Sequence, residues 1–237
     1  MASTDPYTFL KTLIAKDEAE AYARKREAHT PLVVTLSRDY GARGEAIAAK
    51  LGECLGIPVY DREILERAAE KVKVEAFKLE SHDENVEAGV STFLYSLLTG
   101  TGGEMQTYRR GLYEAVLGLA KQDCVMVGRG AHLILAGRKV FRVRIVGSKV
   151  VCAGRVAAET GMSLQEAKHK VYEINNKRHK SIQNLFEDCF EHCSLEFAKN
   201  FDLIINTDHI APENAAPIIL LAMQQAGFDL RKIPPKT

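Results

Sequence analysis

A β-branched segment, a glycine turn and an amphipathic helix follow one another without interruption around residue 40. Residues 32–36 read LVVTL, and a continuous apolar run of this length predicts a strand that is buried on both faces. After the turn, Ile47, Leu51 and Leu55 recur at about helical spacing, and Gly56 is suited to end that helix. A strand buried on both faces and followed directly by a helix indicates an α/β protein.

The same alternation continues along the chain. Further strands are expected at 57–60, 124–128, 140–147 and 201–206. Helices are expected after Asp61, at 104–121, after Gly130, from a capping box at Ser163 and Glu166, and from near Pro212. Parallel strands need crossover connections, which these helices supply, so the pattern predicts a five-stranded, mostly parallel sheet.

The fourth expected strand carries two charges on one face. Arg142 and Arg144 are two residues apart in VFRVRIVG, so their side chains share a side of the strand. That side must therefore meet solvent, a carboxylate or a ligand.

The ends of the chain differ from its middle. Residues 1–30 predict a charged helical appendage, 31–228 the α/β domain and 229–237 a tail, while 75–103 follow no regular pattern. The appendage is expected to pack on the domain, on a partner or on a second copy of the chain.

Composition narrows the classes of function. Lys and Arg number 32 against 31 Asp and Glu, for a net charge of +1, which lacks the basic excess of a general nucleic-acid binder. No apolar stretch approaches the roughly 18 residues of a membrane span, and no secretory signal is visible. Five scattered cysteines suit reduced thiols. We therefore expect a cytoplasmic protein with neither nucleic acid nor membrane as partner.

The turn itself, residues 37–44 (SRDYGARG), carries the clearest chemical signal. Glycines between a strand and a helix let backbone N–H groups converge on an anion, and the helix adds the positive end of its dipole. Arg38 and Arg43 add positive charge, which makes phosphate the first candidate. The P-loop pattern is incomplete because Glu45 stands where a Lys-Ser/Thr pair would follow Gly44. A purely structural turn is the alternative.

A wider set of residues resembles the cytidylate-kinase-like family. The segment from Ser37 to Asp61 contains the family's Ser-Arg-x-Tyr-Gly element and the glycine that follows it at position 44. It also contains the family's Leu-Gly-Ile-Pro and Tyr-Asp elements. Residues 126–135 (MVGRGAHLIL) resemble its Val-Gly-Arg-Gly-Ala element, and 201–207 (FDLIINT) its Tyr-Asp-Leu-x-Ile-Asn-Thr strand. The resemblance implies a three-layer P-loop kinase-like fold with a helical insert and an arginine-bearing lid. It also implies transfer of the γ-phosphoryl group of ATP, bound with Mg²⁺ as the substrate complex, to a monophosphate such as CMP.

The resemblance assigns expected roles to residues of this chain. The backbone amides of residues 40–45 are expected to cradle the donor phosphates. The full set of residues expected at the donor phosphates is Ser37, Arg38, Tyr40, Gly41, Ala42, Gly44 and Glu45. Acceptor binding is expected from Asp61, Arg62, Gly128, Arg129 and Gly130. Catalytic charge stabilisation is expected from Arg43, Arg155 and Arg178. No residue is expected to hold a metal ion outside the nucleotide complex.

Plainer roles stand beside several of these. Arg38 is as well suited to an ion pair with Asp39 or Asp61, Asp61 to capping the next helix, and Arg43 to facing solvent.

Four departures from the family pattern keep other functions open, namely Glu45, Val127, Gly130 and Asn175. A catalytically weak or inactive nucleotide-binding regulatory module is the second hypothesis. A kinase acting on a small metabolite is the third.

Overall fold

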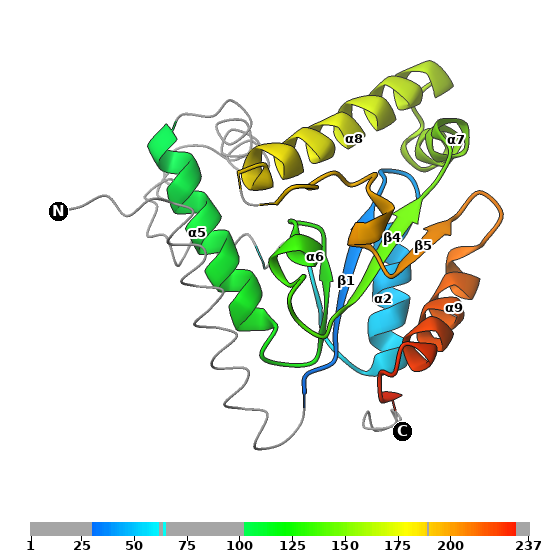
Figure 1. The fold of residues 1–237 in the computed structure, drawn as a ribbon. Helices are drawn as coiled ribbons and strands as arrows, with labels where there is room; N and C mark the ends of the chain where they lie inside the picture. Colours follow the sequence, from blue (N-terminus) through cyan, green and yellow to red (C-terminus); the bar gives the residue numbers. More distant parts are fainter. Residues whose placement is uncertain (1–29, 62–63, 65–101, 189, 231–237) are drawn as a thin grey trace, which may run out of the picture.

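The described part of the chain builds a five-stranded parallel sheet with helices on both sides (Figure 1). The computed structural model describes residues 30–61, 64, 102–188 and 190–230. The strands are β1 (Val33–Arg38), β2 (Val59–Tyr60), β3 (Cys124–Val127), β4 (Phe141–Val146) and β5 (Leu203–Asn206). They lie in the order β2-β3-β1-β4-β5, and every neighbouring pair is parallel. The expected α/β fold with a five-stranded parallel sheet is confirmed.

Helices lie between these strands and after the last one. They are α2 (Gly44–Leu55), α5 (Gly102–Leu119), α6 (Ala131–Ile134), α7 (Lys149–Thr160), α8 (Leu164–Phe186), the 3₁₀ turn η2 (Ala198–Asn200) and α9 (Pro212–Gln225). The expected capping box is present, because the Ser163 hydroxyl accepts from the Glu166 amide and the Glu166 carboxylate accepts from the Ser163 amide. Gly56 ends α2 in the left-handed conformation (φ 66°), as expected.

Strand β1 is buried on both faces. Val34 and Leu36 pack into a core formed with α2 and α9, whereas Val33 packs into a second core formed with α5, α6 and the end of α8. In Figure 1, α8 crosses above the upper end of β4 and meets α7 there. The carboxyl ends of the strands therefore face the region between the sheet and α8.

The charged face of β4 meets carboxylates. Arg142 donates through Nη2 to Asp202 Oδ1 at 2.7 Å and through Nε to Asp202 Oδ2 at 3.1 Å. Arg144, which is buried, donates through Nη2 to Asp39 Oδ1 at 2.5 Å. The sequence left solvent, a carboxylate or a ligand as options for this face, and the structure shows carboxylates.

Several sequence-based expectations fall on segments outside the described residues. These are the N-terminal appendage up to residue 29, Arg62, the irregular segment up to residue 101, Cys189 and the tail from residue 231. Cys54, Cys124, Cys152 and Cys193 are free thiols. Within the ranges that the structure describes, no helix has both the length and the apolar character needed to cross a bilayer.

Candidate functional site

Three connecting loops start at the same edge of the sheet. The Gly128 amide donates to the Leu36 carbonyl at 2.9 Å, and the Asp39 amide donates to the Ile145 carbonyl at 3.0 Å. These bonds place the loop after β3 and the loop after β4 on either side of the loop after β1. Ligands of open α/β sheets gather at this carboxyl edge, which makes it the expected place for a site.

The loop after β1, residues 39–43, forms a tight turn at the start of α2. Gly41 has φ 82°, and Arg43, the N-cap residue of α2, has φ 59° without a side-chain cap. A Cβ at Gly41 would lie 2.7 Å from the Cys152 carbonyl oxygen, and one at Gly44 would lie 2.4 Å from Arg38 Cβ. Both positions therefore need glycine, because the main chain runs against its neighbours there.

The amides of this loop divide into two groups. The Tyr40 amide donates to Asn175 Oδ1 at 2.8 Å, and the Ala42 amide donates to the Asp39 carbonyl at 3.3 Å. Those of Gly41, Arg43 and Gly44 have no acceptor among the described residues. The cradle expected over residues 40–45 is corrected at Tyr40 and Ala42, whose N–H groups the chain itself uses. The open donors lie at the positive end of α2, where an anion is favoured.

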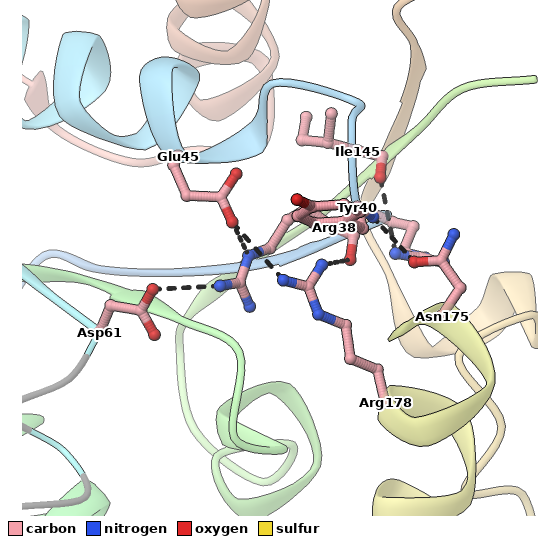
Figure 2. Close-up of polar contacts among 8 residues, drawn as sticks. Arg38, Tyr40, Glu45, Asp61, Ile145, Asn175 and Arg178 are labelled. Atoms are coloured by element: carbon pink, nitrogen blue, oxygen red, sulfur yellow. Dashed lines mark hydrogen bonds and ion pairs between the residues drawn. The ribbon is translucent and has the colours of Figure 1, made fainter. Parts of the chain in front are cut away.

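Arg38 crosses the mouth of the loop and pairs with two carboxylates. Its Nε donates to Glu45 Oε1 at 2.8 Å, and its Nη2 donates to Asp61 Oδ2 at 3.0 Å (Figure 2). Of the two ion pairs open to Arg38, the pair with Asp61 is present, while Asp39 is taken by Arg144. The Arg38 side chain is only 12% exposed, so its charge is held in place at the loop.

Helix α8 brings a second guanidinium to the same point. Arg178 Nη1 donates to the Arg38 carbonyl at 3.0 Å, Nη2 lies 3.7 Å from Glu45 Oε1, and the guanidinium sits 5.9 Å from the centre of the Tyr40 ring. Burial, then the charge of Arg38, lowers the pKa of Arg178 to about 10, which leaves the side chain charged at neutral pH. Asn175 and Arg178 are three residues apart on one face of α8, so this face docks directly on the loop (Figure 2).

The loop after β3 adds a third arginine. Gly128, Arg129 and Gly130 all have left-handed backbone, with φ of 75°, 55° and 69°. A non-glycine residue in this conformation stores strain of about 1–3 kcal/mol and is a frequent mark of a functional site. The Arg129 Nε is buried and has no hydrogen-bond partner among the described residues. Arg129 also contributes to the lowered pKa of Arg178, which places the two charges near each other.

The two glycines that flank Arg129 have distinct neighbours. A Cβ at Gly128 would lie 2.7 Å from Arg38 Nη1, so this glycine lets the guanidinium of Arg38 approach the loop. A Cβ at Gly130 would lie 2.2 Å from the ring of Phe186, at the end of α8. Gly130 is therefore a packing position in this structure.

Two of the expected catalytic arginines point elsewhere. Arg43 Nη2 lies 3.5 Å from Glu159, and both side chains are exposed, in agreement with the solvent-facing alternative. Arg155 Nη1 donates to the Gly41 carbonyl at 3.4 Å and to Thr207 Oγ1 at 3.0 Å, and its Nη2 donates to the Thr207 carbonyl. Because both terminal nitrogens bind the chain, Arg155 joins the loops after β1 and β5. Its geometry is that of a positioning residue.

Two further residues expected at the donor site lie in the core. Ala42 is fully buried, so that only its main chain belongs to the loop. The Ser37 hydroxyl lies 3.3 Å from Nδ1 of His132, and both side chains are buried. The hydroxyl expected at the phosphates is therefore occupied by a core contact.

The structure thus gathers three guanidinium groups and three open amides at one edge of the sheet, with Glu45 and Asp61 as counter-charges. The arginines are Arg38, Arg129 and Arg178. Sequence reasoning missed the contact of Asn175 with the loop, although its spacing from Arg178 places both on one helix face.

Comparisons with known proteins agree with this architecture. The model of a family described as the cytidylate kinase-like family matches residues 33–209. An uncharacterized protein from Eubacterium ventriosum has a similar structure, with a TM-score of 0.60 and 18% identity over 81% of this chain and 98% of the other. TT1252 from Thermus thermophilus has a TM-score of 0.51 and 13% identity over 85% of this chain and 100% of the other. Both likenesses show the fold. No curated protein matches the sequence.

Proposed function

The chain belongs to the cytidylate kinase-like family, and on that premise we propose that it is a nucleotide-binding phosphotransferase. In this proposal it moves the γ-phosphoryl group of ATP, bound with magnesium as the substrate complex, to a small acceptor. The observation that carries the proposal is the set of open amides at Gly41, Arg43 and Gly44, at the positive end of α2 and next to Arg38 and Arg178. Phosphoryl transfer depends on placing the phosphates and neutralising their charge, and this arrangement offers both.

On the donor side, the main chain would bind the phosphates and Arg178 would face the transferring group. The usual P-loop lysine is missing, and Arg43 turns toward Glu159. Arg178 is the cation that α8 delivers to the loop, held there by its bond to the Arg38 carbonyl. A guanidinium at this position can stabilise the negative charge of the transition state.

On the acceptor side, the proposal relies on Arg129. Its buried Nε, which has no partner in the part of the chain that the structure describes, needs an acceptor atom, because a buried donor without one costs free energy of about 1–3 kcal/mol. An anionic group on the acceptor would satisfy it. A monophosphate such as CMP remains the acceptor that the family resemblance implies, and a small acidic metabolite presents the same kind of group.

The second candidate is a regulatory module that binds nucleotide with little or no turnover. Two observations favour it: Glu45 places a carboxylate in the first turn of α2, and the Tyr40 amide is already used by Asn175. Both reduce the capacity of the loop for phosphate.

One experiment separates these candidates. The purified chain is incubated with magnesium-ATP and a panel of acceptors, both nucleoside monophosphates and small hydroxy acids. ADP formation is followed, and ATP binding is measured directly. Turnover with any acceptor supports the phosphotransferase, binding without turnover supports the module, and absence of both rejects the two.

A variant pair links any activity to Arg178. Arg178→Ala is expected to reduce ADP formation by at least about tenfold, on the scale of one lost charged hydrogen bond. Lys177→Ala is the control, since Lys177 is exposed and pairs with Glu173 on the outer side of α8. Equal rates in the two variants would exclude Arg178 from catalysis.

A further inference from the structure

The carboxylate of Glu45 occupies the position at which the two loop-facing guanidinium groups meet. Arg38 donates to its Oε1 at 2.8 Å, and Arg178 approaches the same oxygen to 3.7 Å (Figure 2). Glu45 belongs to the first turn of α2, so its charge also lies near the positive end of that helix. Arg38, Arg178 and the positive end of α2 all favour a phosphate at the loop. All three therefore already face a negative charge that the chain supplies.

Glu45 carries that charge at neutral pH. Burial by itself would raise the pKa of Glu45, but the charge of Arg38, the backbone amide and the charge of Arg178 together lower it. Its side chain is nevertheless 54% exposed, against 12% for Arg38. The carboxylate can consequently turn toward solvent without any change in the main chain.

We infer that Glu45 is an internal competitor for phosphate: its carboxylate pairs with Arg38 and Arg178 at the loop, and a polyphosphate must displace it to bind. This inference rests on the proposed function and adds the residue that sets the affinity of the donor site. Displacement would leave Arg178 bound to the Arg38 carbonyl, so the cation stays in place for the incoming phosphate.

Neutralising the carboxylate is the direct test. Glu45→Gln keeps an oxygen that can accept from Arg38 but removes the charge. Two unit charges about 5 Å apart interact strongly enough, even at the dielectric constant of water, to change an affinity several-fold. We therefore expect Glu45→Gln to bind ATP at least about fourfold more tightly than the unchanged protein.

The matched control is Glu53→Gln. Glu53 lies on the same helix, eight residues further on, about 12 Å along the axis, and pairs with Lys50. The substitution Glu53→Gln makes the same change in net charge as Glu45→Gln. Its effect on ATP affinity is expected to stay within about twofold because salt screens exposed charges at this distance. Glu45→Ala is a second test variant, and thermal unfolding checks that all three variants fold.

Inorganic tripolyphosphate, bound in parallel at the same ionic strength, tests whether the effect lies at the phosphates. Tighter binding of both probes by the Glu45 variants alone supports the inference. Unchanged or weaker binding, an equal gain in Glu53→Gln, or a gain for ATP without one for tripolyphosphate overturns it. If neither the unchanged protein nor any variant binds either probe, the proposed function fails as well, which distinguishes the two failures.

Discussion

Replacing Gly41 by alanine should damage the loop after β1 in two separable ways. The residue has φ 82°, a conformation that costs a residue with a side chain about 1–2 kcal/mol. In addition, the new methyl group would lie 2.7 Å from the Cys152 carbonyl oxygen and 3.0 Å from Cys152 Cβ. Both neighbours belong to helix α7, so relief requires a shift of main chain, at a cost of about 1–3 kcal/mol. The expected loss of unfolding free energy is about 2–5 kcal/mol.

Gly161 provides the control for the first of these costs. It has φ 73° at the end of α7, and a Cβ built there meets nothing within 4 Å. Gly161→Ala therefore measures the backbone strain alone, about 1–2 kcal/mol. The difference between the two variants isolates the contact with Cys152.

Urea denaturation followed by circular dichroism measures both values, since the chain contains no tryptophan to report by fluorescence. ATP binding provides a second measurement. Gly41→Ala is expected to weaken it, because the shift moves the open amides, whereas Gly161→Ala should leave it unchanged. Equal losses of stability in the two variants would show that the loop is not packed on Cys152 and would refute the reasoning.

Two further predictions concern the buried His132 and Arg129, whose buried Nε finds no partner among the described residues. Burial, then the charges of Arg144 and Arg142, lowers the pKa of His132 to about 3. The unfolded chain therefore binds more protons between about pH 6.5 and 3, and stability should fall with decreasing pH by up to about 1.4 kcal/mol per unit. Urea denaturation at pH 7 and pH 5 measures this slope, which should shrink in His132→Gln. Arg129→Ala should lower kcat/KM for the acceptor, by an amount that corresponds to about 2–3 kcal/mol of activation free energy, with the fold intact. Unchanged kinetics would contradict its role.

The fold was open to prediction because its signals are local. Each strand is a short apolar run, and the starts of helices carry visible caps, as at Ser163. The differences lie in where elements end: the sequence predicts that the first strand ends at residue 36, whereas it continues to Arg38. Ser37 and Arg38 are polar, but the ladder with β4 extends over both, and a neighbouring strand is not visible in a local pattern.

The partners within the site could not be predicted in the same way. The bond from the Tyr40 amide to Asn175 joins residues 135 positions apart, and the bond from Arg178 to the Arg38 carbonyl spans 140. Sequence patterns showed that the face carrying Arg144 meets solvent, a carboxylate or a ligand, yet nothing nearby indicated that Asp39, 105 positions away, would be its partner. Folding decides such pairs, since they depend on how α8 and β4 are placed against the loop.

Under the proposed function, these long-range contacts also suggest a way for a loop without the P-loop lysine to bind a phosphate. Arg178 is fixed by the bond to the Arg38 carbonyl at 3.0 Å, whereas its approach to Glu45, at 3.7 Å, is longer than a hydrogen bond. On Arg178, the contact that an incoming phosphate would replace is thus the longer of the two, although the 2.8 Å bond from Arg38 Nε to Glu45 would have to be replaced as well. Because the bond to the Arg38 carbonyl holds the Arg178 guanidinium beside the open amides, the proposed exchange of the carboxylate for a phosphate would need a movement of the Glu45 side chain and none of α8.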